Sequence, residues 1–210
     1  MKLKVTVVGK TVPLVGNGIE TISDFLMYMA KVSNPKGQFT KTNLMNYLIK
    51  NKHWSPLEMA SVQIEVECPR DISRQILRHT SARFQEFSQR YAEVQEFTVR
   101  ELRRQDLENR QNSIDDFSEE DKREFEADCY WAIEFANIMY QKWLKHGAAK
   151  ECARVFLPEG LTMSRLYMSA PIRTWYHYLD VREGNGTQKE HILVANEIRK
   201  VLHDLEPELF

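Results

Sequence analysis

Alternation of apolar and polar residues predicts the strands of this chain. From residue 62 to residue 68 every second position is apolar and the positions between are polar, which is the period of a half-buried strand. Residues 3–8 form an apolar-rich run, and residues 166–172 form an apolar, partly alternating run. The pattern therefore predicts three strands, with Pro171 starting the helix that follows the third.

Apolar residues spaced three and four positions apart predict helices in most of the remaining chain. Thr21 and Asp24 form a capping pair for a helix over residues 22–29. Ser118 and Asp121 cap a long helix with an apolar stripe of Phe125, Cys129, Ala132, Ala136, Met139 and Trp143. Further helices are expected over residues 44–53, 151–157 and 171–179. A last helix has a capping box of Thr187 and Glu190 and bears Ile192, Ala195, Ile198, Leu202 and Leu205.

These elements predict an α+β fold, in which a small, mainly antiparallel sheet is packed by several helices, including one long helix. A length of 210 residues suits one domain over residues 1–210. Residues 95–117 are polar, with mixed charges and no clear period. We expect them to form a surface excursion rather than a linker between domains.

Composition and charge are those of an ordinary soluble protein. Hydrophobic residues make up 42% of the chain, and the formal net charge is −1, whereas a general nucleic-acid binder usually has a basic excess. No run approaches the roughly 20 apolar residues that cross a bilayer, and the first residues lack the features of a signal peptide. We therefore expect a cytoplasmic protein without membrane or nucleic-acid partners.

Cysteine and histidine spacing predicts no metal site. Cys68, Cys129 and Cys152 are far apart and odd in number, so they form neither a disulfide framework nor a CxxC clamp. Three buried, reduced thiols are the preferred interpretation. The histidines at 146, 191 and 203 also lack the spacing of metal ligands.

A helix predicted from Pro69 to about Thr80 carries three arginines on one side. At about 100° per residue, Arg70, Arg74 and Arg78 fall within a sector of roughly 80°, and Pro69 occupies the favoured first turn. Guanidinium groups bind phosphate and carboxylate oxygens in bidentate fashion. The arginine face is therefore either an anion site or a solvated basic face with local ion pairs.

The segment after this helix combines hydrogen-bonding and aromatic side chains. The polar residues can read a flat heterocycle and a phosphate; they are Gln85, Glu86, Ser88, Gln89 and Arg90. The aromatic residues are expected to anchor the backbone; they are Phe84, Phe87 and Tyr91. This composition indicates a site for an anionic, aromatic ligand but does not name a reaction.

The run RHTSARFQEFSQRY, residues 78–91, resembles the signature of flavin-dependent thymidylate synthases, which is Arg-His-Arg, seven residues and then Ser. Four further blocks resemble other parts of that family in the same order: AKVSNP at 30–35, KHWSPLE at 52–58, ECARVFLP at 151–158 and LDVREGNGTQKEH at 179–191. One block alone is weak evidence. An ordered set of five that spans most of the chain is strong evidence for this family.

The resemblance implies an enzyme that methylates dUMP to dTMP. It implies FAD as the cofactor, NADPH as its reductant, methylene-tetrahydrofolate as the carbon donor, and a homo-oligomer, most often a tetramer. In the family no protein nucleophile is used, although Cys152, close to Arg154, is kept here as an alternative nucleophile.

The resemblance also implies site residues. Arg182 is the implied catalytic residue, because a guanidinium against the uracil edge stabilises developing negative charge; a helix-terminal arginine that interacts with the helix dipole is the alternative. The implied dUMP contacts are Gln75, Arg78, Glu86, Phe87, Ser88, Gln89, Arg90, Arg154 and Arg182. The implied FAD contacts are His53, Ser55, Arg78, His79, Thr80, Glu86 and His177.

One position departs from the family motif. Thr80 stands where the family has an arginine that helps to hold the flavin, and threonine supplies only one hydroxyl. Arg83, three residues later, is a candidate for partial compensation. Because of Thr80, two alternatives stay open: a paralogue that modifies another pyrimidine nucleotide or adds a hydroxymethyl group, and a non-catalytic nucleotide- or RNA-binding relative. A helical DNA-binding module fits the near-neutral charge poorly.

Overall fold

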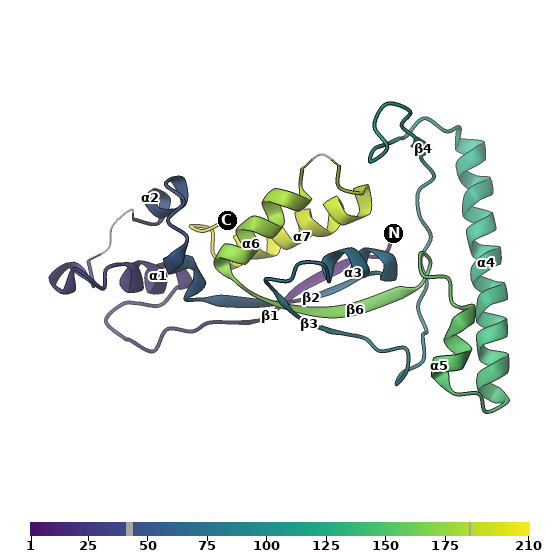
Figure 1. The fold of residues 1–210 in the computed structure, drawn as a ribbon, viewed down its shortest axis with the longest axis horizontal. Helices are drawn as coiled ribbons and strands as arrows, with labels where there is room; N and C mark the ends of the chain where they lie inside the picture. Colours follow the sequence, from purple (N-terminus) through teal and green to yellow (C-terminus); the bar gives the residue numbers. More distant parts are fainter. Residues whose placement is uncertain (41–43, 185) are drawn as a thin grey trace.

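The computed structural model describes residues 1–40, 44–184 and 186–210, and its elements confirm the predicted α+β fold (Figure 1). The strands are β1 (Lys4–Lys10), β2 (Ser61–Pro69), β3 (Arg83–Glu86), β4 (Arg104–Gln105), β5 (Ser113–Ile114) and β6 (Met163–Pro171). The helices are α1 (Ile22–Ala30), α2 (Leu44–Lys50), α3 (Arg70–Ile76), α4 (Glu119–Lys145), α5 (Lys150–Ala153), α6 (Ile172–Arg182) and α7 (Lys189–Leu205). Short 3-10 turns occur at Pro35–Gly37, Ser55–Glu58 and Arg154–Phe156.

The main sheet has the order β1-β2-β6-β3, and every neighbouring pair is antiparallel. Because side chains alternate across a strand, the apolar positions of β2 all point to one face, where they are fully buried. Helices α3, α6 and α7 cover that face (Figure 1). Gln63, Glu65 and Glu67 on the other face are only half-buried. The alternation that predicted β2 thus reflects a structure of two layers, the sheet and the helices that cover one of its faces.

The core lies between the sheet and the helices that cover it. Ile64, Leu166, Trp175 and Ile198 are fully buried and belong to one continuous apolar cluster. Trp175 also satisfies its indole N–H, which donates to the carbonyl oxygen of Val62 at 3.3 Å. Each large side chain buried in this way contributes about 1.5–3 kcal/mol to the stability of the fold. The burial of Trp175 and Ile198 therefore holds α6 and α7 against the sheet.

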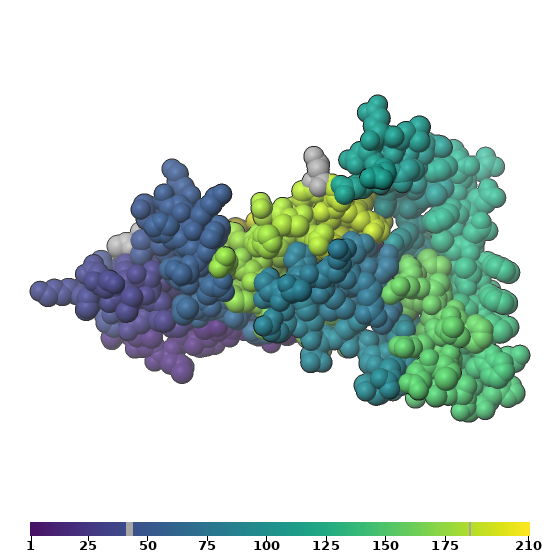
Figure 2. Space-filling model, viewed as in Figure 1, coloured from purple at the N-terminus to yellow at the C-terminus, as the bar shows by residue number. Residues whose placement is uncertain are grey.

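Helix α4 lies beyond one end of the sheet and packs on α5 (Figures 1 and 2). The predicted capping box is present, because Ser118 accepts from the Asp121 backbone and Asp121 accepts from Ser118. Of the predicted apolar stripe, Cys129 and Ala136 are buried, but Trp143 is 43% exposed. The stripe prediction was therefore wrong at Trp143, because only a narrow strip of α4 contacts the rest of the chain.

The arginine helix is shorter than its sequence predicted. Helix α3 ends at Ile76 instead of near Thr80. After Leu77, the amides of Arg78 and His79 bond back only three residues and tighten the chain into a turn before β3. Pro69 is the N-cap residue, outside the first helical turn. The face predicted to hold three arginines therefore holds Arg70 and Arg74, while Arg78 lies in the turn.

The predicted capping box of the last helix is also wrong. The N-cap of α7 is Gln188, which makes no capping bond with its side chain. Thr187 instead donates to the carbonyl oxygen of Val181 at 3.2 Å. Glu190 faces inward and pairs with Arg103, 2.6 Å away. An ion pair with a distant segment has replaced the local capping bond.

Two further expectations need correction in part. Cys68 and Cys129 are buried thiols, but Cys152 is exposed. Residues 95–117 do form an exposed excursion with a short β4–β5 hairpin, yet Arg100 and Arg103 turn inward to contact Asp71 and Glu190. None of the helices within residues 1–40, 44–184 and 186–210 combines the length and apolarity that crossing a bilayer requires.

Candidate active site

Glu86, at the end of β3, is the centre of a charged cluster beside the first turn of α3. Its carboxylate accepts from the hydroxyls of Ser73 at 2.5 Å and Ser164 at 2.9 Å. Arg74 donates to it at 3.1 Å, and Nη1 of Arg70 lies 3.6 Å away. Ser73 lies on α3 and Ser164 on β6, so this one carboxylate ties the helix to the sheet.

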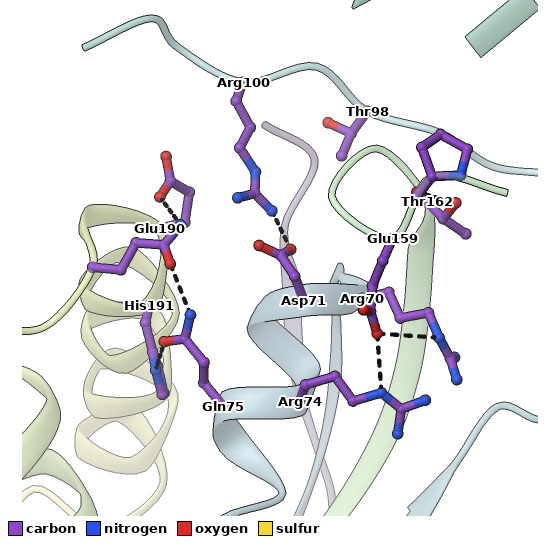
Figure 3. A network of polar contacts seen from close by, with 12 residues as sticks. Arg70, Asp71, Arg74, Gln75, Thr98, Arg100, Glu159, Thr162, Glu190 and His191 are labelled. Carbon is purple, nitrogen blue, oxygen red and sulfur yellow. Dashed lines mark hydrogen bonds and ion pairs between the residues drawn. The ribbon is translucent and has the colours of Figure 1, made fainter. Parts of the chain in front are cut away.

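The cluster has more guanidinium groups than carboxylates. Glu159 also contacts Arg70 and Arg74 (Figure 3), but Nη1 of Arg70 is buried and makes no hydrogen bond. Arg154 is half-buried, and among the described residues its guanidinium has no hydrogen bond or ion pair. Burial lowers the pKa of Arg70, and the nearby charges of Arg74 and Arg154 lower it further, in opposition to Glu86. The surplus positive charge favours an anionic ligand.

The motif residues after β3 lie next to this cluster. Arg90 pairs with Glu151 of α5 at 3.0 Å, which brings residues 88–90 to the helix that precedes Arg154. The Ser88 hydroxyl accepts from the Arg90 amide at 3.3 Å, and Gln89 is buried. Phe87 packs on the smaller core cluster, as predicted for an anchor. Tyr91 is 78% exposed, so its predicted anchoring role was wrong.

At the other end of α3, His79 contacts Arg182, the last residue of α6. Arg182 Nε donates to His79 Nε2 at 2.8 Å, and the ring of His79 packs edge-on against Tyr178. Burial, and then the positive charge of Arg182 and the neighbouring His177, lowers the pKa of His79 to about 4. At neutral pH His79 is therefore uncharged and holds the Arg182 guanidinium by accepting its N–H.

A buried hydrogen-bond chain that sequence reasoning missed reaches Gln75. Gln75 contacts His191 at 3.2 Å and Gln188 at 2.7 Å, and His191 contacts the hydroxyl of Tyr178 at 2.9 Å. From the sequence, His191 was considered only as a possible metal ligand and was rejected because of its spacing. Its position next to the apolar stripe of α7 was the one signal that it has a buried hydrogen-bond partner.

A pocket of about 690 Å³ lies between α6 and the turn at Ser55–Glu58, and of the predicted flavin residues only His177 lines it. Trp54, Tyr176 and His177 give it aromatic walls. Its charged lining residues are Lys52, Arg173, Glu58 and Asp180, and Arg173 pairs with Glu58 at 2.9 Å. His53 and Ser55 flank Trp54 and are exposed. Thr80 is also exposed, and its carbonyl oxygen accepts from Arg83 at 3.1 Å.

The structure therefore places the predicted residues in three groups. Those at the start of α3 are Glu86, Ser88, Gln89, Arg90 and Arg154, and those at its end are Gln75, Arg78, His79 and Arg182. At the pocket, His177 is a lining residue, and His53 and Ser55 flank the lining residue Trp54. The first two groups are about 10 Å apart along a seven-residue helix. Throughout the described ranges, no group of three or more His, Cys, Asp or Glu residues is arranged to hold a metal ion.

Comparison with known proteins finds similar chains of one enzyme family. A flavin-dependent thymidylate synthase from Synechocystis sp. is 44% identical over 177 residues, covering 84% of this chain and 82% of that protein. A probable flavin-dependent thymidylate synthase of Paramecium bursaria Chlorella virus 1 is 43% identical over 201 residues, covering 91% of this chain and 89% of that protein.

A solved structure has the same fold over the whole chain. The UMP/dUMP methylase of Streptomyces cacaoi, bound with 5-Br dUMP, superposes with a TM-score of 0.83 at 25% identity and covers 99% of this chain and 93% of that one. The model of the thymidylate synthase complementing protein family matches residues 20–208. The chain therefore belongs to the family of flavin-dependent thymidylate synthases, which is the enzyme family that its five ordered sequence blocks predicted.

Proposed function

We propose that this protein catalyses the reductive methylation of dUMP to dTMP, with methylene-tetrahydrofolate as carbon donor, FAD as cofactor and NADPH as its reductant. The observation that carries the proposal is the pair of sites at the two ends of α3. One end has guanidinium groups in excess of carboxylates around Glu86, and the other end has Arg182 held by His79. A nucleotide matches this arrangement, because its anionic phosphate suits the guanidinium-rich end and its polar base suits the end with Arg182.

The nucleotide would bind along α3 with its phosphate near Arg154, which has no other partner among the residues described. Ser88, Gln89 and Arg90 are next to it, and Glu86 and Phe87 support this end. Gln75, Arg78 and Arg182 would contact the base. The Arg182 guanidinium would stabilise negative charge that develops on the pyrimidine ring, which is assistance of the kind that often dominates catalysis.

The pocket beside α6 fits a flavin in size and chemistry. Its volume of about 690 Å³ lies within the usual range for ligand sites, roughly 300–1,000 Å³, and Trp54 and Tyr176 offer aromatic surfaces. His177 lines this pocket, and His53, Ser55, Arg78, His79 and Thr80 are the other residues that would hold the cofactor. Glu86, which the resemblance also implied, lies in the charged cluster at the start of α3 instead. When bound and reduced, the flavin supplies the hydride that completes the methyl group.

The direct test is a binding and turnover assay on the purified protein. We expect a yellow protein whose flavin bleaches with NADPH and reoxidises in air, and whose product from dUMP has the mass of dTMP. A colourless protein that also fails to bind added FAD would contradict the proposal and favour a non-catalytic binding protein.

A second candidate substrate is UMP. The matching protein of known structure is named a UMP/dUMP methylase, and its structure with 5-Br UMP superposes with a TM-score of 0.83 at 27% identity. Thr80, which departs from the family motif, is a second reason to consider another pyrimidine nucleotide as substrate. Parallel assays with dUMP and UMP, with both products identified by mass spectrometry, decide between them and also detect a hydroxymethyl product.

The outer face of α4 supports the proposal of a homo-oligomer, with four copies as the expected number. Tyr130, Trp131, Phe135 and Ile138 are all more than half exposed on this helix at the molecule's end. A contiguous exposed apolar face of this kind marks a protein interface. A neighbouring copy would bury these side chains, each worth about 1.5–3 kcal/mol.

Phe135→Glu is therefore expected to dissociate the oligomer, because it places a charge in an apolar interface. Size-exclusion chromatography with light scattering measures the change. Asn196→Glu is the matched control: it adds the same charge at an exposed position of α7, outside the apolar face of α4, and should leave the mass unchanged. An unchanged mass for Phe135→Glu would remove this face of α4 from the interface.

Thr80→Arg is expected to tighten FAD binding about tenfold, since one charge-assisted hydrogen bond contributes roughly 1.5 kcal/mol or more. Thr80 is exposed, so the new side chain has room. Fluorescence titration with FAD measures the affinity, and Thr80→Gln, which adds length without charge, is the control. Unchanged or weaker binding in Thr80→Arg would mean that the pocket is built differently around Thr80.

A further inference from the structure

An ion pair between two distant segments stands at one end of the hydrogen-bond chain that reaches Gln75. Arg103, in the 95–117 excursion, donates to Oε1 of Glu190 at 2.6 Å, and both side chains are nearly buried. Nε2 of Gln188 lies 2.8 Å from Oε2 of Glu190. On the other side of the same amide, Oε1 of Gln188 lies 2.7 Å from Nε2 of Gln75. Figure 3 shows Gln75 reaching from α3 toward the start of α7.

The direction of every hydrogen bond in this chain follows from its charged end. Burial by itself would raise the pKa of Glu190, but hydrogen bonds from Arg103 and Gln188 outweigh it and lower that pKa, so Glu190 is ionised and only accepts. Gln188 must then donate its N–H to Glu190 and turn its oxygen to Gln75. The Gln75 amide nitrogen must in turn donate to that oxygen.

The other side of Gln75 agrees with this direction. Its oxygen faces Nδ1 of His191, which has to be the protonated nitrogen of that ring. Burial, followed by the positive charge of Arg182 and, in acid, that of protonated His79, lowers the pKa of His191 to about 3. The ring is therefore neutral, and its Nε2 accepts from the hydroxyl of Tyr178 at 2.9 Å. Both ends of the Gln75 amide are fixed.

We propose that Arg103, Glu190, Gln188 and His191 are positioning residues that lock the Gln75 amide in one orientation and thereby make the site select uracil over cytosine. The inference rests on the proposed function, in which Gln75 contacts the base. Uracil presents an oxygen at position 4 and an N–H at position 3, whereas cytosine presents an amino group and a bare nitrogen there. An amide that is free to flip matches either base, but a locked amide matches only one.

The discriminating experiment replaces the ion pair by neutral residues in the flavin-loaded protein. The double variant Arg103→Met/Glu190→Gln removes both charges together, which avoids an unpaired buried charge. A neutral Gln at position 190 both donates and accepts, so Gln188 and Gln75 gain the flipped orientation. Titration calorimetry with dUMP and with dCMP gives the two dissociation constants, and their ratio is the quantity of interest.

The wild type is expected to prefer dUMP, and the double variant should lose roughly tenfold to a hundredfold of that preference, the usual discrimination of a bidentate polar contact. Its kcat at saturating dUMP should change less than its KM, because Arg182 is untouched. The control is Arg100→Met/Asp71→Asn, which removes a neighbouring ion pair between the excursion and α3 (Figure 3). The side-chain partners of Gln75 are Gln188 and His191, so this ion pair is outside the hydrogen-bond chain. The control should keep the preference.

A second pair of variants tests the other end of the chain. His191→Leu removes the donor to the Gln75 oxygen and should lower the preference, whereas His191→Asn retains an N–H near the position of Nδ1 and should restore it. A folded double variant that keeps the wild-type preference, or a control that loses it equally, would overturn the inference alone. A wild type that binds neither nucleotide would overturn the proposed function and the inference with it.

Discussion

Arg182→Ala is expected to lower turnover about a hundredfold to a thousandfold while FAD remains bound, which is the usual cost of removing one group that stabilises transition-state charge. Arg182 is only half-buried at the end of α6, so its loss creates no large cavity. Single-turnover measurement of dTMP formation at saturating dUMP, together with FAD titration, separates the chemical step from binding.

The contact between Arg182 and His79 determines how this experiment is controlled. Removing the guanidinium removes one of the charges that lower the pKa of His79, so that pKa rises toward its ordinary value of 6.5 but stays below it because the ring remains buried. Assays near pH 8 keep His79 neutral in both proteins. Arg123→Ala, at an exposed position of α4, is the control, and near-normal turnover of Arg182→Ala would exclude Arg182 from the mechanism.

Glu86→Gln is expected to lower the free energy of unfolding by about 3 kcal/mol, because breaking one side of a buried ion pair leaves a charge without compensation. The Arg70 side chain is 9% exposed, and Glu86 is the carboxylate nearest to it, at 3.6 Å, whereas Glu159 is 4.0 Å away. Glutamine keeps the size of the side chain and can still accept from the two serine hydroxyls. The change therefore removes the charge and the acceptor for Arg74, and it keeps the size of the side chain and its contacts with the serines.

Glu159→Gln is the matched control for this substitution. Glu159 contacts the same two arginines but its side chain is 56% exposed, and exposed ion pairs contribute only about 0–1 kcal/mol. Urea denaturation without ligands, at one protein concentration for all variants, measures both effects. Equal losses for Glu86→Gln and Glu159→Gln would show that the cluster is held by exposed charge attraction rather than by the buried carboxylate.

The sequence by itself determined the features that depend on neighbouring residues. Strict alternation identified β2, because a strand with one covered face has a period of two. The capping boxes of Thr21 with Asp24 and Ser118 with Asp121 were predicted correctly, because both partners lie within one helical turn. The ordered blocks also identified the family, and the structure brings residues from four of them to the ends of α3 and to the pocket beside α6.

Tertiary structure alone decided which polar groups meet across distant segments. The capping prediction at Thr187 failed because Arg103, far away in the sequence, pairs with Glu190, and the end of α3 was misplaced because the chain must turn there into β3. His191 became part of the site only when α7 packed beside α3 and α6. A buried hydrogen bond or ion pair depends on positions in space, and local periodicity contains no information about partners a hundred residues apart.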